Sequence, residues 1–537
     1  MLPGVTAEDF RAADSEAVRR PRRWLSAAGW ITAALAGFAV YLRLGRTMPV
    51  NSDGASQALQ AWDLLHGNLL LHGWSLTDVS FYTTELPEYA LAEMARGLGA
   101  DVVHVAAAVS YTLVVLLAAA VAKGRATGRQ AAFRMLMAAG IMLAPQLGGG
   151  TNTLLLSPDH TGSSAPLLAA FLILDRCPRR WWPAAAASLV LAWAVIGDEL
   201  VLVAGVVPVA AVCAFRLIRE RSRFEAWLGA GAVAAGAVGM AVPRVIGALG
   251  GYGTRPLNTG LSPLGTIVGH NLPVVGQGFL LLGGAWLPHV PAGAQDWFTA
   301  LHLAGVALAA AGIAVTAWRF FRGESLVPQV LLAGIVVNVA AYLAGTHAVV
   351  LADAREMAPV LPFAAALAGR RLPGALSARP AGRRVAVPVL GLVLAGYAAG
   401  LGLELTVPPA PPQNAALTAW LARHPMGGSG LSGYWQSNIV TLTSGGRARV
   451  RSLIGGDDGR LVPDHSNVDG RWYDPAASYA DFVVLGPRVP GYTPGPGYPG
   501  FHDAGIVRAT FGKPARVYHV GLYTILRWHK NLLADLK

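Results

Sequence analysis

The chain has 537 residues, of which 54% are hydrophobic and only 13% are charged. Soluble domains carry roughly 25% charged residues, so this composition argues against a soluble protein and favours many membrane spans. The formal net charge of +12 comes from an Arg-rich, Lys-poor composition and does not indicate binding to nucleic acid. The two cysteines, Cys177 and Cys213, predict neither a disulfide nor a metal cluster.

The apolar residues gather in long uncharged runs, which predict membrane-spanning helices. A polar tail, 1–23, precedes the first run, which is too long for a cleaved signal and is predicted to stay in the protein. Several runs are shorter than the ~20 residues that a perpendicular span needs, so a count of ten or twelve stays open beside eleven. The predicted helices cover 24–44, 102–122, 135–147, 165–175, 184–196, 200–218, 228–247, 297–318, 326–346, 358–369 and 385–405.

The placement of Lys and Arg predicts the orientation of these helices, because cytoplasmic loops carry the excess of both. With the N-terminus inside, the cytoplasmic segments hold 23 Lys and Arg residues. The loops on the opposite side hold only Arg46, Arg96, Arg255 and Arg355. We therefore expect a multi-pass plasma-membrane protein whose N-terminus is cytoplasmic and whose C-terminal part is extracytoplasmic.

Two external loops and the C-terminal region have further structure. In the loop 45–101, apolar residues at Leu59, Trp62, Leu65 and Leu69 predict an amphipathic helix on the outer membrane face. The Gly/Pro-rich loop 248–296 is expected to be partly re-entrant. After a Pro-rich linker, 406–537 should form a small α/β domain, with a helix over 414–424, strands within 447–454, 480–486 and 516–528, and a loop at 491–500. The fold class is thus a polytopic helix bundle, 24–405, with this domain attached.

Acidic residues gather at the external ends of the predicted helices. A transporter places ionisable groups in mid-membrane, and here the apolar runs offer few polar side chains, with Asn338, Tyr342 and His302 as exceptions. This distribution favours an enzyme that acts at the outer membrane surface. The acids in question are Asp53, Asp63, Asp78, Glu85, Glu88, Asp159, Asp198, Glu199, Asp353 and Glu356.

Asp53 follows the first helix directly, in the sequence Pro-Val-Asn-Ser-Asp-Gly-Ala. An acidic residue at the start of a long first external loop, followed by a surface helix, resembles the GT-C class of membrane glycosyltransferases. The resemblance implies a polyprenyl-phosphate sugar as donor, an inverting reaction, and Asp53 as the general base that deprotonates the acceptor hydroxyl. The alternative is that Asp53 only caps the following helix.

Two further motifs carry the same resemblance. Glu85 lies in the aromatic, Pro-containing stretch Phe81–Tyr89, and Asp159 lies in Ser157-Pro-Asp-His-Thr161. The resemblance implies that Glu85 and Asp159 are supporting acids, and that Asp159 and His160 are the candidates for a divalent metal. Alternatively, His160 hydrogen-bonds a phosphate or caps a helix.

Arg355 is the best candidate for binding the donor phosphate, since an Arg can grip a phosphate with two parallel hydrogen bonds. It lies in the segment from His347 to Pro359, which resembles the His/Arg and Pro segment of the class. His347 and Arg244 are the further phosphate candidates. The alternative for Arg355 is an ion pair with Asp353 or Glu356.

These features lead us to expect a GT-C-type hexosyl- or pentosyltransferase of the bacterial cell envelope. Its partners would be membrane lipid, the polyprenyl-phosphate sugar, and a glycan, lipid-linked or protein acceptor. Two alternatives stay open, a transporter or flippase of a lipid-linked precursor and a non-catalytic membrane assembly protein.

Overall fold

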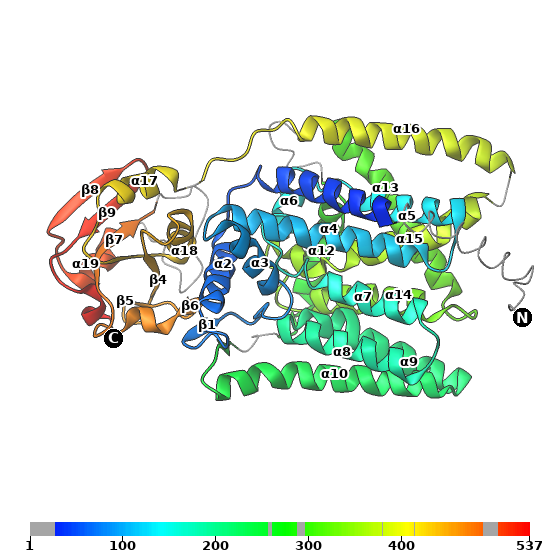
Figure 1. The fold of residues 1–537 in the computed structure, drawn as a ribbon, viewed down its shortest axis with the longest axis horizontal. Helices are drawn as coiled ribbons and strands as arrows, with labels where there is room; N and C mark the ends of the chain where they lie inside the picture. The colour runs from blue at the N-terminus through cyan, green and yellow to red at the C-terminus, as the bar shows by residue number, and fades with distance from the viewer. Residues whose placement is uncertain are drawn as a thin grey trace, which may run out of the picture.

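The computed structural model describes residues 27–255, 260–286, 296–377, 380–412, 414–486 and 503–536. A long helix bundle and a smaller C-terminal α/β domain lie end to end (Figure 1). The predicted tail 1–23 and the predicted loop 491–500 lie outside the described residues. The predicted fold class is confirmed.

Every predicted apolar run coincides with a helix. Six helical segments in the described part of the chain are long and apolar enough to cross a membrane, namely Ala27–Gly45, Asp101–Lys123, Leu202–Glu220, Arg223–Ala248, Asp296–Arg319 and Leu326–Ala344. The number of crossings stays a prediction, because the other helices are shorter or less apolar. Ala27–Gly45 matches the first predicted run. The helices that match the other predicted runs are, in chain order, α4 (Asp101–Lys123), α5 (Gly128–Met142), α7 (Ser164–Arg176), α8 (Trp181–Gly197), η1 (Leu202–Val206) continuing into α9 (Val207–Glu220), α10 (Arg223–Ala248), α13 (Asp296–Arg319), α14 (Leu326–Ala344), α15 (Val360–Ser377) and α16 (Pro380–Glu404).

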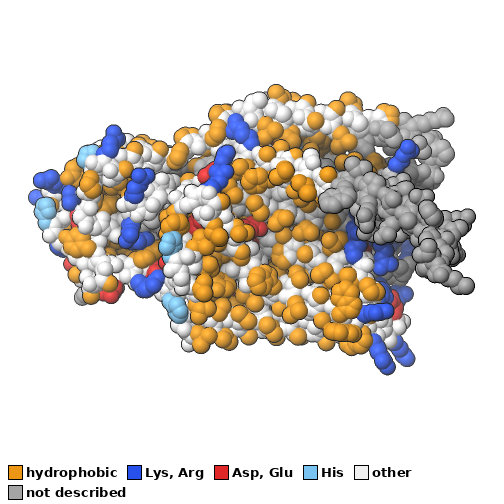
Figure 2. Space-filling model, viewed as in Figure 1, with side chains coloured by type: hydrophobic (Ala, Val, Ile, Leu, Met, Phe, Trp, Pro, Cys, Tyr) orange, Lys and Arg blue, Asp and Glu red, His pale blue; other side chains and the backbone are white. Residues whose placement is uncertain are grey.

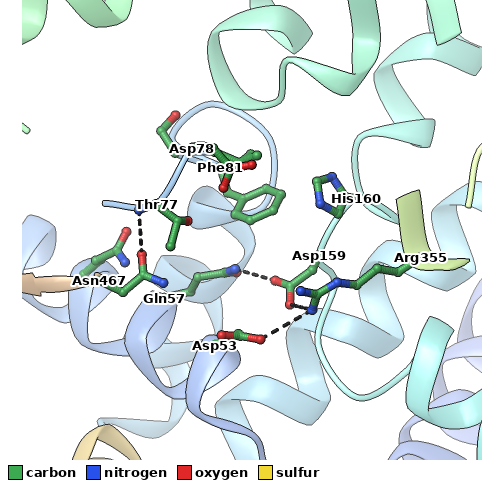
Figure 3. Close-up of a pocket in the computed structure, with 12 residues that line it drawn as sticks. Asp53, Gln57, Thr77, Asp78, Phe81, Asp159, His160, Arg355 and Asn467 are labelled. Atoms are coloured by element: carbon green, nitrogen blue, oxygen red, sulfur yellow. Dashed lines mark hydrogen bonds and ion pairs between the residues drawn. The ribbon is translucent and has the colours of Figure 1, made fainter. Parts of the chain in front are cut away.

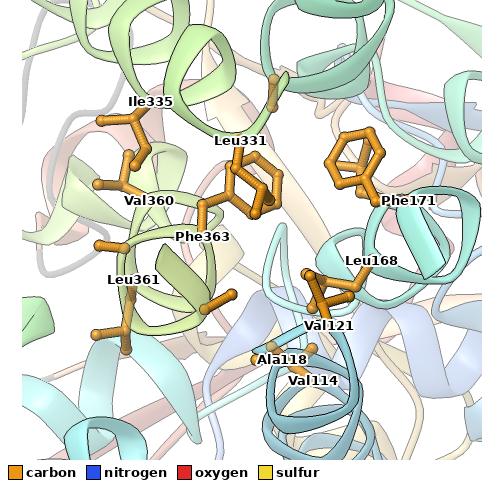
Figure 4. Packing of buried hydrophobic residues seen from close by; sticks show 14 of the residues in the cluster. Val114, Ala118, Val121, Leu168, Phe171, Leu331, Ile335, Val360, Leu361 and Phe363 are labelled. Carbon is orange, nitrogen blue, oxygen red and sulfur yellow. The ribbon is translucent and has the colours of Figure 1, made fainter. Parts of the chain in front are cut away.

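The core of the bundle lies where α4, α5, α7, α14 and α15 meet. The rings of Phe171 and Phe363 pack 5.6 Å apart at its centre, among aliphatic side chains such as Leu331 (Figure 4). Small residues let the helices approach closely, as membrane helices do. A Cβ on Gly312 of α13 would lie 2.5 Å from the backbone nitrogen of Ala368 in α15, so this crossing requires glycine.

Arg and Lys side chains gather at the end of the bundle away from the C-terminal domain (Figure 2). Orange apolar side chains dominate the visible side of the bundle between that end and the domain. An apolar belt between polar ends is what a bilayer requires of a spanning protein. The distribution agrees with the predicted orientation, which stays a prediction.

The segment 45–101, the predicted first external loop, forms α2 (Ser52–Leu65), β1 (Trp74–Leu76) and α3 (Leu86–Arg96). The expected helix is therefore present, but its small and polar face is the buried one, with Ser52 and Ser56 fully covered. Leu65 and Leu69 are exposed, and their contact with the membrane stays a prediction. In the loop 248–296, the apolar stretch forms α12 (Leu272–Leu282), whose Val275 and Leu281 enter the bundle core.

The C-terminal domain is a six-stranded mixed sheet with the order β5-β4-β3-β7-β9-β8. Central β3 is parallel to β4 and β7, and the other pairs are antiparallel. The predicted helix is α17 (Ala415–Arg423), and the predicted strands are confirmed as β4, β7 and the β8–β9 hairpin. The elements are β3 (Ser429–Ser432), α18 (Tyr434–Thr443), β4 (Val450–Gly455), β5 (Leu461–Pro463), β7 (Ala480–Leu485), α19 (Ala504–Phe511), β8 (Arg516–Val520) and β9 (Tyr523–Arg527).

A second, three-stranded sheet joins this domain to the bundle. In it, β1 pairs in parallel with β2 (Gly253–Thr254) and antiparallel with β6 (Val468–Asp469). The rings of Trp74 and Trp472 meet edge to face across this junction, 5.2 Å apart. Helix α18 packs directly on α2. The C-terminal domain therefore packs against the segment 45–101, which contains Asp53.

Candidate active site

Asp53 lies in the first turn of α2. The cap of this helix is Asn51, whose side chain accepts a hydrogen bond of 2.9 Å from the Gly54 amide. The alternative that Asp53 caps this helix is therefore wrong, because Asn51 is the cap. A carboxylate in the first turn is also favoured by the helix dipole. The Asp53 side chain instead lines a cavity.

Two further candidate residues, each from a different predicted external loop, lie beside Asp53 (Figure 3). Arg355 Nη1 lies 3.4 Å from Asp53 Oδ2 and 3.6 Å from Asp159 Oδ2. The short helix η4 (Leu351–Met357) presents Arg355, and Asp159 lies in the loop before α7. The sequence alternative of an ion pair between Arg355 and Asp353 or Glu356 is wrong. Asp353 instead accepts backbone amides, including that of Val350 at 2.9 Å.

Asp159 is almost fully buried and has several hydrogen-bond donors around it. Ser157 Oγ donates to Asp159 Oδ2 at 2.6 Å, and the Gln57 amide donates to Oδ1. Burial raises the pKa of Asp159, while the Arg355 guanidinium and the Ser157 hydroxyl oppose that shift. Gln57 follows Asp53 by four residues on α2, so both side chains lie on one face of the helix.

His160 forms a buried ion pair with Asp198, which is the residue that ends α8. The distance from His160 Nδ1 to Asp198 Oδ2 is 2.9 Å. Burial alone would lower the pKa of His160, but the Asp198 carboxylate outweighs it and raises this pKa to about 9. The ring is therefore an imidazolium at neutral pH.

Two neighbouring cavities meet at His160. The first, of about 110 Å³, is lined mainly by polar groups, among them Asp53, Asp159 and Arg355. The second, of about 450 Å³, is lined mainly by apolar side chains, with His347 and Glu356 among its polar residues. The residues common to both linings are Asp78, Val79 and His160.

The backbone is strained at three of the residues that line the first cavity. Five non-glycine residues in the described part of the chain have a left-handed backbone, and three of them line this cavity, namely Phe81 at φ 50°, His160 at φ 58° and Asn467 at φ 54°. Such conformations cost of order 1–3 kcal/mol each and persist where the surroundings impose them, often at functional sites.

The other candidates lie in different places. His347 lines the second cavity and has Nδ1 3.9 Å from Glu356 Oε1. Glu85 is fully buried outside both linings and accepts a hydrogen bond of 3.1 Å from Ser163. Burial raises the pKa of Glu85 well above its ordinary value. Arg244 is exposed and donates to the carbonyl oxygen of Met240 in its own helix, so the structure does not bring it into the site.

The side chains around Asp159 and His160 do not provide a suitable set of ligands for a divalent metal. The Arg355 cation occupies the place between Asp53 and Asp159 that a metal would take, and His160 Nδ1 is engaged by Asp198. Within the described ranges, no group of three or more His, Cys, Asp or Glu side chains is placed to hold a metal ion. Asp159 and His160 are therefore not proposed as metal ligands.

Sequence reasoning missed two groups of the C-terminal domain and one of α2. Tyr434 and Asn467 reach the Asp53 region from α18 and from the segment before β6, and no sequence pattern indicates this. Gln57 could have been found, because its spacing of four residues from Asp53 places both on one helical face.

The fold has known counterparts although the sequence does not. No protein-family model matches the chain, and a search of curated sequences finds no match. A crystal structure of ArnT from Cupriavidus metallidurans bound to undecaprenyl phosphate matches with a TM-score of 0.54 at 13% identity, over 93% of this chain and 97% of that chain. The apo state of the same ArnT matches with a TM-score of 0.52 at 14% identity, over 95% and 99%.

A structure of the Archaeoglobus fulgidus oligosaccharyltransferase, tethered with an acceptor peptide, matches with a TM-score of 0.49 at 15% identity, over 86% and 70%. The ArnT matches show that the chain has the fold of ArnT along nearly its whole length.

Proposed function

We propose that the protein is a membrane glycosyltransferase that moves a sugar from a polyprenyl-phosphate donor to a hydroxyl of an extracytoplasmic acceptor. The observation that carries the proposal is the position of Arg355. Its guanidinium lies between Asp53 and Asp159 in a polar cavity, next to a larger apolar one. A GT-C fold and the ArnT structure that contains undecaprenyl phosphate support this donor class.

The two cavities match the two halves of such a donor. The apolar cavity suits the first isoprenoid units, since its lining includes Leu202, Val203 and Ala341. The polar cavity suits a sugar, whose hydroxyls need hydrogen-bond partners. The phosphate would then lie at the junction, where His160 carries a positive charge and Arg355 is close by.

The Arg355 ion pairs are loose enough to be exchanged for a phosphate. Charge-assisted hydrogen bonds are typically about 2.7–2.9 Å long, whereas Arg355 lies 3.4 Å and 3.6 Å from its two carboxylates. A phosphate that binds the Arg355 guanidinium in place of the two carboxylates would leave Asp53 Oδ2 facing the sugar and the acceptor. Donor binding would thus prepare the base.

The reaction is a single displacement. Asp53 Oδ2 takes the proton of the acceptor hydroxyl as its oxygen bonds to the anomeric carbon. The bond from that carbon to the phosphate oxygen breaks, and its electron pair leaves on the polyprenyl phosphate. Arg355 and His160 stabilise the charge that develops there. Attack opposite the leaving group inverts the anomeric configuration.

The ion pair between His160 and Asp198 predicts a pH dependence of donor binding. Because the pKa of His160 is raised to about 9, the KM for the donor should rise as the pH passes through about 9 and the imidazolium is lost. Asp198→Asn removes the raising charge, so that the rise in KM should begin below neutral pH. The measurement is the initial rate against donor concentration between pH 5.5 and about 10.

Glu199→Gln is the matched control, because it neutralises the adjacent carboxylate and leaves Asp198 in place. A wild-type KM that stays flat through pH 9 would contradict phosphate binding by His160. The same ion pair stabilises the fold fully below the ordinary His pKa of 6.5, and this contribution is lost as the pH rises through about 9.

The transport alternative predicts polar side chains free in mid-membrane. Asn338 instead donates to the Glu356 carbonyl oxygen at 3.2 Å, and His302 bonds the carbonyl oxygens of Phe298 and Ala144. Asn338 and Tyr342 both line the apolar cavity. Backbone carbonyl groups therefore engage His302, and the other two exceptions lie in the proposed donor site.

Reconstitution in vesicles tests the proposal against transport. The protein is supplied with a mixture of radiolabelled polyprenyl-phosphate sugars and a crude envelope glycan and lipid fraction. We expect release of polyprenyl phosphate together with a labelled product of inverted anomeric configuration. Movement of intact donor across the bilayer without cleavage would instead support the flippase alternative, and the absence of both would support an assembly protein.

A further inference from the structure

The C-terminal domain contacts Asp53 directly through Tyr434, the first residue of α18. The Tyr434 hydroxyl donates to Asp53 Oδ1 at 2.6 Å, and Ser52 Oγ donates to the Tyr434 carbonyl oxygen at 2.5 Å. These two bonds join the first turn of α18 to the first turn of α2. The Tyr434 side chain is 7% exposed and lies behind Asp53, outside the set of residues that lines the polar cavity.

The direction of the bond from Tyr434 is determined by Asn467. Asn467 Nδ2 donates to the Tyr434 hydroxyl oxygen at 3.1 Å, while its Oδ1 accepts from the Thr77 amide at 3.4 Å. An amide nitrogen can only donate, so the phenol accepts from Asn467 and must direct its own proton to Asp53. The left-handed backbone of Asn467, at φ 54°, is a conformation that Asn adopts more readily than most residues.

The geometry leaves the two oxygens of Asp53 with different tasks. Oδ1 is held by Tyr434, whereas Oδ2 faces Arg355 in the cavity. We propose that Tyr434 positions the Asp53 carboxylate for proton abstraction, so that the extracytoplasmic domain completes the active site of the membrane domain. This inference rests on the proposed function. Tyr434 is a positioning residue, because it acts through Asp53.

The surroundings of Tyr434 suit this role. Burial and the Asp53 charge raise the pKa of Tyr434 well above its ordinary value, so the hydroxyl keeps the proton that it donates. Contacts at the edge of the domain hold the arrangement in place. Arg471 Nη2 lies 3.2 Å from Asp63 Oδ2 at the far end of α2, and β6 pairs with β1.

Tyr434→Phe tests the role, because it deletes the hydroxyl and keeps the ring. The substitution removes one hydrogen bond to the Asp53 carboxylate, which must be aligned for the reaction. It should lower kcat about tenfold to a hundredfold, with the donor KM little changed. In an Asp53→Asn background, Tyr434→Phe should have no further effect.

Tyr473→Phe is the matched control. The Tyr473 side chain is buried in the same domain, and its hydroxyl donates to the Ser452 carbonyl oxygen and not to Asp53. We expect both variants to lower the thermal unfolding temperature in detergent similarly, and only Tyr434→Phe to lower kcat with the donor KM little changed.

A Tyr434→Phe variant that keeps the wild-type kcat, while Asp53→Asn is inactive, would overturn the positioning role alone. An effect on kcat no larger than that of Tyr473→Phe would likewise overturn it. An active Asp53→Asn variant would overturn the proposed function itself.

Discussion

Asp53→Asn is expected to lower the rate of sugar transfer by about 100- to 10,000-fold, the range that a general base contributes. Asn has the same shape and can still accept the hydrogen bond from Tyr434, but it cannot take a proton from the acceptor. Asp53→Glu should also lose activity severely, because a misplacement of ~1 Å can cost about a hundredfold. The measurement is the release of polyprenyl phosphate at saturating donor and acceptor.

Azide separates the loss of a base from a general distortion of the site. As a nucleophile it needs no deprotonation, so at high concentration it should restore donor cleavage in Asp53→Asn and form the inverted glycosyl azide. Asp457→Asn is the control, since Asp457 is an exposed acid of the C-terminal domain. Near-normal transfer by Asp53→Asn would refute the assignment of the base.

Arg355→Ala is expected to reduce kcat/KM for the donor by about 100- to 1,000-fold, the scale reported for loss of one electrostatic donor at a transition state. The variant removes the cation expected to bind the phosphate and leaves Asp53 and Asp159 facing each other without it. Arg355→Lys should recover part of the loss, because a lysine keeps the charge but cannot form two parallel bonds.

Arg96→Ala is the matched control for Arg355. It also lies in an external loop, but it is half exposed and pairs with Asp101 at the surface. Exposed ion pairs are worth about 0–1 kcal/mol, so we expect this variant to be nearly wild type. A defect in Arg96→Ala as large as that in Arg355→Ala would show that the effect is not specific to the site.

The sequence determined the helical architecture, because a bilayer imposes a simple rule on it. Each of the eleven apolar runs coincides with a helix, since apolar side chains and satisfied backbone groups are required in lipid. The strands β4, β7 and β8–β9 were also predictable from their β-branched and aromatic residues. The acids at the external ends of the helices indicated where a site would lie.

Only the tertiary structure shows which residues contact one another in the candidate site. Asp53, Asp159 and Arg355 are separated by up to 302 residues in the chain, and periodicity carries no information about which loops meet. Local reasoning could therefore offer only its neighbours Asp353 and Glu356 as alternative ion-pair partners of Arg355. The structure instead pairs Arg355 with two distant carboxylates.

The role of the C-terminal domain was likewise decided only by packing. Composition predicted an α/β domain after residue 405, and nothing in it distinguished Tyr434 from other aromatic residues. The hydrogen bond from Tyr434 to Asp53 exists because β6 pairs with β1 and α18 packs on α2. Apolar patterning is a local property that a sequence displays directly, whereas contacts between distant polar groups arise only when the folded chain brings their elements together.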